Sequence, residues 1–94
     1  MTDELVAAAV ADLVGRLNVE AAAITVVSDE AVVWPDGSAG CPQPGMMYPQ
    51  MLTEGSRIVL EHAGRRYDYH SARNRPPFLC EQPGSPFSRK HPLR

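Results

Sequence analysis

The sequence lacks several features that would assign it to a common class of protein. It has no apolar run near the roughly 20 residues of a membrane-spanning helix, so we expect no direct insertion into a membrane. It has no phosphate-binding glycine motif and no cofactor fingerprint, so we expect no cofactor. Its 94 residues predict one domain with a modest core, near the lower size limit for folding alone.

The chain also lacks an excess of positive charge, because its formal net charge is −2. With no recognised motif beside its arginines, this balance argues against a nucleic-acid partner. The charge is unevenly distributed, with a net −6 in residues 1–47 and a net +4 in residues 48–94. This asymmetry predicts either attraction between the two halves or a basic face for an acidic partner.

The amino terminus, MTDELVAAAVADLV, has acidic residues where a secretory signal carries basic ones. We therefore expect mature structure from the start of the chain and a cytoplasmic location. Residues 1–81 form the predicted domain. Residues 82–94 form a predicted proline-rich basic tail that has little to bury and is expected to be disordered alone.

The stretch WPDGSAGCPQPGMMY, residues 34–48, is the most unusual part of the chain. Its density of proline and glycine excludes a regular helix or an interior strand. A flexible linker would be polar, whereas this stretch carries Trp34, Met46, Met47 and Tyr48, which favour burial or contact. The pattern predicts an ordered loop, serving either as a cover for the core or as a binding surface.

Periodic apolar residues predict one helix followed by strands. Val6, Val10, Leu13, Val14 and Leu17 share one helical face, with Thr2 as amino-terminal cap and Asn18 as the stop. Residues 24–27 and 31–34 are predicted strands joined by a turn at 28–30, and 57–62 and 66–70 are a second pair. Residues 78–80 fit either a short last strand or an anchor.

These elements predict an α+β fold, with one amino-terminal helix packed on an antiparallel sheet of about four strands and the 34–48 loop folded over one end. The predicted core consists of the helical stripe together with apolar strand residues. Its members are Val6, Val10, Leu13, Val14, Leu17, Ile24, Val26, Val32, Trp34, Ile58, Leu60, Tyr67 and Tyr69.

Cys41 and Cys80 are the only cysteines, and three states are open to them. Free thiols are the default in a cytoplasmic protein. A disulfide would close a loop of about forty residues and fasten the 34–48 loop to the carboxy-terminal segment. Metal ligation is the third state, in which both cysteines, His70 and one of Met46 and Met47 would suit copper(I) or zinc. A Cys41–His70 nucleophile is also conceivable, but no orienting third group is identifiable.

The run W-P-D-G-S-x-G-C-P-Q-P-G-M-M-Y, followed by R-I-V-L-E, G-R-x-Y-x-Y-H and F-L-C, resembles a family of small bacterial proteins and modules of unknown function. The resemblance covers about residues 10–81. It implies no activity, but it marks the loop and the Tyr67–His70 strand as signature positions. Some members look secreted, where a Cys41–Cys80 bridge would be natural.

Our leading hypothesis is a non-catalytic accessory or adaptor domain that binds a larger protein assembly. The expected binding residues are large apolar or basic side chains of the loop and tail: Trp34, Met46, Met47, Tyr48, Phe87, Arg89 and Lys90. The alternative is a metal-binding or redox protein that uses Cys41, His70 and Cys80. A further alternative, from an outline similar to subtilisin-inhibitor-like proteins, is a protease-inhibitor loop that exposes Met46 or Met47.

Overall fold

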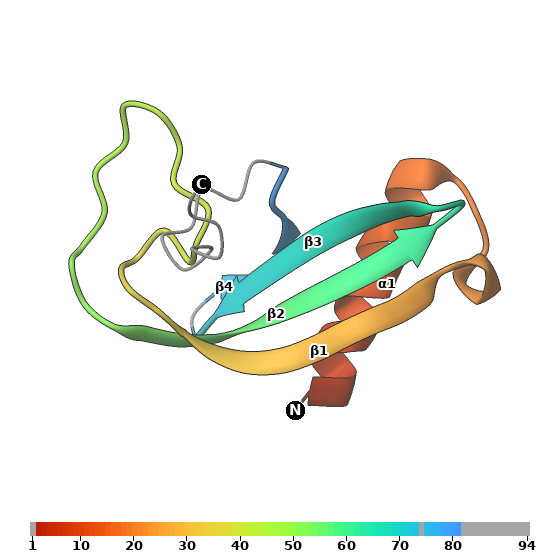
Figure 1. Cartoon of the computed structure of the whole chain (residues 1–94), viewed down its shortest axis with the longest axis horizontal. Helices are drawn as coiled ribbons and strands as arrows, with labels where there is room; N and C mark the ends of the chain where they lie inside the picture. The colour runs from red at the N-terminus through yellow and green to blue at the C-terminus, as the bar shows by residue number, and fades with distance from the viewer. Residues whose placement is uncertain (1, 74, 82–94) are drawn as a thin grey trace.

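The computed structural model describes residues 2–73 and 75–81, which form one helix and a four-stranded antiparallel sheet (Figure 1). Helix α1 spans Thr2–Leu17, and a short 3₁₀ turn, η1, spans Ala21–Ala23. The strands are β1 (Thr25–Trp34), β2 (Thr53–His62), β3 (Arg65–Ala72) and β4 (Arg75–Leu79). They lie in the order β1-β2-β3-β4. The predicted α+β class is therefore confirmed.

One predicted turn is wrong, because residues 28–30 continue the first strand. Ser28, Asp29 and Glu30 pair with Val59, Ile58 and Arg57 of β2, and the register shifts between Val26 and Ser28. A polar Ser-Asp-Glu run is typical of a turn, but here it lies on an edge strand, where polar side chains can face water. The fourth strand is β4, which includes residues 78 and 79 of the segment 78–80 that was left open as strand or anchor, whereas Cys80 follows the strand.

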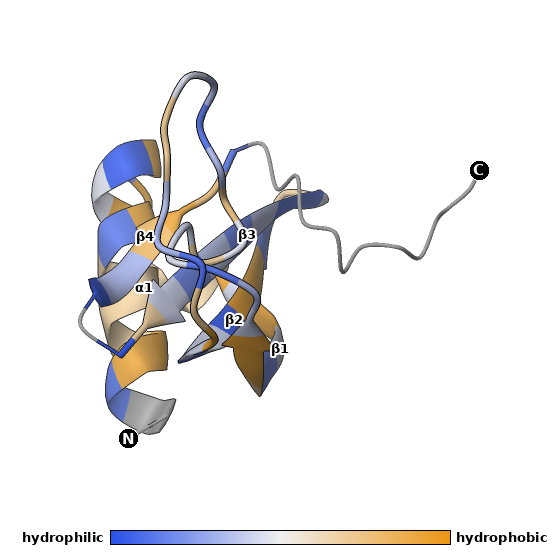
Figure 2. Cartoon of the chain, turned by 90° about the vertical axis from the view of Figure 1, so that its left-hand side faces the viewer, coloured by the Kyte–Doolittle hydropathy of each residue, from blue (hydrophilic) through white to orange (hydrophobic). Residues whose placement is uncertain are grey.

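Helix α1 covers one face of the sheet, behind the strands in Figure 1. It ends where the sequence predicted, since Leu17 is its last residue and Asn18 adopts a left-handed φ of 59°. The fully buried centre of this helix face consists of Ala9, Leu13, Ile58, Leu60 and Tyr69, with other apolar residues packed around it. Figure 2 shows the apolar stripe of α1 turned toward the sheet.

The predicted core differs from the observed one at several positions. Val26 is 43% exposed because it lies on edge strand β1, whereas α1 approaches the sheet most closely at the opposite edge, β4. Val14 and Val32 are only partly buried. Ala9, Leu5 and Leu79 join the core without having been predicted. The sequence therefore identified the correct face of α1 but placed the core too close to β1 and too far from β4.

The connection between β1 and β2, residues 35–52, has two parts that behave differently. The first part, residues 35–41, folds over the sheet face opposite α1, because Tyr69 faces the helix while its neighbour His70 contacts this part of the loop. The second part, residues 42–52, extends beyond one end of the sheet (Figure 1). Within the described residues, no helix is long and apolar enough to cross a membrane.

Candidate functional site

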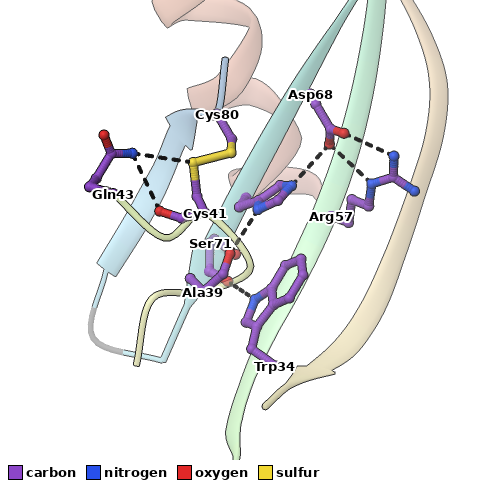
Figure 3. Close-up of polar contacts among 9 residues, drawn as sticks. Trp34, Ala39, Cys41, Gln43, Arg57, Asp68, Ser71 and Cys80 are labelled. Carbon is purple, nitrogen blue, oxygen red and sulfur yellow. Dashed lines mark hydrogen bonds and ion pairs between the residues drawn. A yellow bond between two sulfur atoms is a disulfide. The ribbon is translucent and has the colours of Figure 1, made fainter. Parts of the chain in front are cut away.

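Trp34, the last residue of β1, anchors the first part of the loop on the sheet. Its side chain is only 2% exposed, and its Nε1–H donates a hydrogen bond of 2.8 Å to the Ser71 carbonyl oxygen of β3 (Figure 3). Two glycines make room for the indole. Gly40, at a φ of +73°, lies against the ring, and a Cβ on Gly55 would collide with the Ser71 carbonyl and the indole nitrogen.

A disulfide between Cys41 and Cys80 fastens the end of this part to the segment that follows β4. Of the three states that the sequence allowed, the structure selects the disulfide, and the expectation of free thiols is corrected. Both sulfur atoms are thereby withdrawn from metal binding, because the thiolate is the form that ligates a metal. Among the described residues, no group of three or more histidine, cysteine or acidic side chains is placed to hold a metal ion.

His70 lies at the centre of this face and is 1% exposed. Its ring stacks on Trp34 with centroids 4.5 Å apart. Its Nδ1 lies 2.7 Å from the carbonyl oxygen of Ala39 in the loop, and its Nε2 lies 3.2 Å from Oδ1 of Asp68 (Figure 3). A carbonyl and a carboxylate only accept hydrogen bonds, so either ring nitrogen finds an acceptor in place when it carries a hydrogen.

Asp68 connects His70 to Arg57 on the neighbouring strand. Arg57 donates to both carboxylate oxygens, through Nε at 3.0 Å and through an amino nitrogen at 2.9 Å. Burial by itself raises the pKa of Asp68, but hydrogen bonds from His70 and Arg57 and their positive charges outweigh it and lower that pKa below its ordinary value. The face opposite α1 therefore carries a hydrogen-bonded chain, Arg57–Asp68–His70, that ends on the loop backbone.

This arrangement has a direct chemical consequence for the Cys41–His70 hypothesis. The sulfur of Cys41 is bonded to Cys80, and both nitrogens of His70 have acceptor partners within the domain. In this geometry the pair contains no thiolate nucleophile and no vacant ring nitrogen for a substrate or a metal. Residues that sequence spacing could not show to be close are brought together, but they join the loop to the sheet.

The second part of the loop has its own internal contacts. The Tyr48 hydroxyl accepts a hydrogen bond of 3.0 Å from the Gln43 backbone N–H, and the Gly37 N–H donates at 2.9 Å to the Pro49 carbonyl oxygen. The first hydrogen bond closes residues 43–48, and the second closes the longer segment 37–49 around them. Its methionines nevertheless point outward, since Met46 is 60% exposed and Met47 is 92% exposed.

Two further apolar side chains of the loop are exposed, Met51 at 62% and Leu52 at 76%. We call these two residues, together with Met46 and Met47, the methionine surface. Met51 and Leu52 also line a hollow at the base of the loop, and Arg73 and Arg75 belong to the same lining. The Arg75 guanidinium lies 3.9 Å from the centroid of the Phe78 ring.

The predicted binding residues separate into three groups. Met46 and Met47 are exposed as expected. Trp34 is buried, and Tyr48 is partly buried with its hydroxyl turned inward, so these two hold the loop in place. The tail residues of the prediction, Phe87, Arg89 and Lys90, lie outside the described residues.

Sequence reasoning missed Met51 and Leu52 because the predicted loop ended at Tyr48. The signal for them was present, since the strand they precede opens with the polar residues Thr53 and Glu54. Asp68 and its partner Arg57 were not among the predicted site residues. The pairing of Arg57 with Asp68 depends on the register of β2 against β3. The tight Ala63–Gly64 turn sets that register, so it could have been derived by counting residues outward from the turn.

The fold and this site define a small α+β domain whose long loop is fixed by a disulfide. The model of a domain of unknown function (DUF8738) matches residues 6–80, and the chain belongs to this family. No curated protein and no solved structure matches the chain. The matched region includes Cys41, Cys80 and the anchored loop between β1 and β2.

Proposed function

We propose that this protein is a non-catalytic accessory domain that docks on a larger protein through its methionine surface. One observation carries the proposal. Of the seven large hydrophobic side chains that are exposed among the described residues, four lie in residues 42–52, which directly follow the loop segment anchored by the disulfide and the Trp34–His70 stack. Exposed apolar side chains concentrated on one segment are typical of an interaction site.

The anchoring supports docking because it reduces the cost of binding. A free loop loses conformational entropy when a partner fixes it, whereas this loop is already closed by the Gly37–Pro49 and Gln43–Tyr48 hydrogen bonds. Methionine side chains remain flexible on that fixed backbone and adapt to an irregular apolar groove. The loop thus combines a fixed backbone with adaptable contact groups.

The surroundings of the surface indicate the chemistry of the partner. Arg73 and Arg75 line the same hollow as Met51 and Leu52, and Glu54 is the acidic side chain in that lining. A partner groove with an apolar floor and an acidic rim would meet both the methionines and the two guanidinium groups. The basic tail, with Phe87, Arg89 and Lys90, extends the same proposal, since it would add positive charge for the same rim.

The two alternative functions have less support. A metal or redox role for Cys41, His70 and Cys80 requires reduction of the disulfide and release of His70 from Ala39 and Asp68. An inhibitor loop binds a protease in extended form, as an added strand. Gly45 has a φ of +79° directly before Met46, so the chain turns where such a loop would be extended.

The disulfide also changes the proposed location. Disulfides persist where the surroundings are oxidising and are rare where glutathione keeps thiols reduced. We therefore place the working form of this protein in a non-reducing compartment rather than in the cytoplasm that the sequence suggested. The thiol state of Cys41 and Cys80, measured by alkylation and mass spectrometry immediately after lysis of the source cells, tests this point.

The docking proposal is tested by comparing three tagged versions of the full chain in their own cells. One is unaltered, one carries Met47→Asp with Leu52→Asp, and one carries Val26→Asp. Val26 is a matched control because it is also exposed and apolar but lies at the other end of β1. Native mass spectrometry of the gently captured material identifies any stoichiometric partner.

We expect one partner to be recovered with the unaltered and Val26→Asp proteins and to be lost with the loop variant. Equal recovery with all three would reject the methionine surface as the docking site. Removal of residues 82–94 tests the tail separately. That truncation is expected to weaken capture without lowering the thermal midpoint of unfolding, and unchanged capture would exclude the tail from the interface.

A further inference from the structure

Three thioether sulfurs belong to the methionine surface, and all three side chains are open to solvent. Met46 is 60% exposed, Met47 is 92% exposed and Met51 is 62% exposed. The hydrogen bonds that hold residues 35–52 use other groups, chiefly backbone atoms and the Tyr48 hydroxyl. The loop therefore presents oxidisable side chains that its own backbone conformation does not require.

We propose that Met46, Met47 and Met51 form a reversible oxidation site that turns docking off. The proposal rests on the docking function above and adds its regulation. A peroxide transfers one oxygen atom to the thioether sulfur: the O–O bond breaks, an S=O bond forms, water leaves, and the sulfur loses two electrons. A methionine sulfoxide reductase reverses the step with a dithiol, which becomes a disulfide as the oxygen leaves as water.

The physical effect follows from the change in polarity. A thioether is apolar and adaptable, whereas a sulfoxide is polar and rigidly pyramidal at sulfur. Burying a sulfoxide in an apolar groove without a hydrogen-bond partner is unfavourable. Oxidation of all three makes three of the four side chains of the methionine surface polar, and Leu52 alone remains apolar.

The fold itself is insulated from this chemistry. The methionines are absent from the buried cluster of Ala9, Leu13, Ile58, Leu60 and Tyr69. The Cys41–Cys80 disulfide is already oxidised and buried, so a mild peroxide has no thiol to attack there. Oxidation is therefore expected to alter the surface and leave the domain folded.

The test compares the full-length protein with a variant carrying Met46→Leu, Met47→Leu and Met51→Leu, which keeps the surface apolar but cannot be oxidised there. Both are treated with dilute hydrogen peroxide and then with the two sulfoxide reductases, one for each epimer. Peptide mass spectrometry follows each methionine, and hydrophobic-interaction chromatography reports the polarity of the surface. Met1, present in both proteins, serves as the internal control for oxidation elsewhere.

We expect Met47 to oxidise first, the thermal midpoint of unfolding to stay unchanged, and retention on the column to fall for the unaltered protein alone. Capture of the partner should weaken by about tenfold or more on oxidation and recover after the reductases, while the leucine variant binds throughout. Unchanged retention, or unchanged capture by fully oxidised protein, would overturn the oxidation site. That result differs from failure of the docking function, in which Met47→Asp with Leu52→Asp leaves capture intact.

Discussion

The two faces of the sheet are held by different forces. On the helix face, Leu13, Ile58 and Leu60 are fully buried against one another. On the loop face, the buried residues of the loop are all small, Ser38, Ala39, Gly40 and Cys41. The contacts that hold the loop are the disulfide, the Trp34 hydrogen bond and the Arg57–Asp68–His70 chain. Apolar burial suffices for a helix with a stripe of large side chains. A proline- and glycine-rich loop has no such stripe and requires cross-links and polar anchors.

The largest expected effect comes from the loop face, on removing the disulfide with Cys41→Ala and Cys80→Ala. The bridge closes a segment with a sequence separation of 39, for which the chain-entropy relation gives about 4 kcal/mol. Urea unfolding of the double variant measures the loss, and a reducing agent should lower the stability of the unaltered protein but not of the variant. A loss below about 1 kcal/mol would mean that the polar anchors alone hold the loop.

On the helix face, Leu13→Ala should be the most damaging single truncation of α1. Leu13 is 0% exposed at the centre of the buried cluster, and such truncations cost about 3 kcal/mol through lost burial and the cavity that remains. Val14→Ala is the matched control, because Val14 is the next residue on the same helix but only partly buried. A comparable loss for the two variants would show that α1 is less firmly seated than its burial indicates.

The contrast between the faces also explains what the sequence could predict. Helix α1 was predictable from its apolar period, and the predicted strands 57–62 and 66–70 lie within β2 and β3, around the Ala63–Gly64 turn, although the first four residues of β2 were missed. The continuation of β1 through Ser28–Glu30 was not predictable, because an edge strand tolerates the same polar residues as a turn. The exposure of Val26 depends on where α1 crosses the sheet, which no local pattern records.

The candidate site was predictable only in part, for the same reason. Residue composition indicated an ordered loop with exposed methionines, and Met46 and Met47 are exposed. Trp34 was predicted both in the core and among the binding residues, and it is buried, because a large aromatic side chain suits an anchor as well as an interface. His70 contacts Ala39, which lies 31 residues away in the sequence, and Asp68, which lies two positions away on the same strand. Both contacts follow from the folded arrangement and not from sequence spacing.

A smaller effect on the loop face is expected from Asp68→Asn, which removes the charge between Arg57 and His70. Because Asp68 is only 16% exposed but Arg57 is 45% exposed, we expect a loss of about 2 kcal/mol, below that of a fully buried pair. Glu61→Gln is the control, since its pair with Arg66 is long, at 4.0 Å, and open to solvent, and should contribute under about 0.5 kcal/mol.

The same substitution predicts how the loop face responds to acid. The pKa of Asp68 lies below 3.8 in the folded protein, so the unfolded chain takes up the proton first as pH falls. The contribution of Asp68 to the free energy of unfolding is therefore complete above about pH 4 and is lost as pH falls through the pKa of Asp68 in the folded protein. Urea unfolding at several pH values should show the difference between the unaltered protein and Asp68→Asn shrinking in acid. If the difference in stability between the two proteins stays constant with pH, the ionised Asp68 carboxylate does not stabilise the loop face.

The smallest effect is expected on the helix face, from Tyr69→Phe. The Tyr69 hydroxyl donates to Asp12 at 2.7 Å, and the loss of this bond should cost about 1 kcal/mol at neutral pH. Burial, and next the hydrogen bond to Asp12, raise the pKa of Tyr69 above 10.0. The unfolded chain therefore ionises first, and the contribution of Tyr69 is lost as pH rises from about 10 toward the folded pKa.

Stability measured from neutral pH to above pH 10 should consequently fall less steeply for Tyr69→Phe than for the unaltered protein. Tyr67→Phe leaves the Tyr69 hydroxyl in place and should keep the steep fall. If both variants follow the unaltered protein, the Tyr69–Asp12 link does not hold α1 to the sheet. With the expected result, the two faces respond to opposite limits of pH, since Asp68 makes the loop face sensitive to acid and Tyr69 makes the helix face sensitive to alkali.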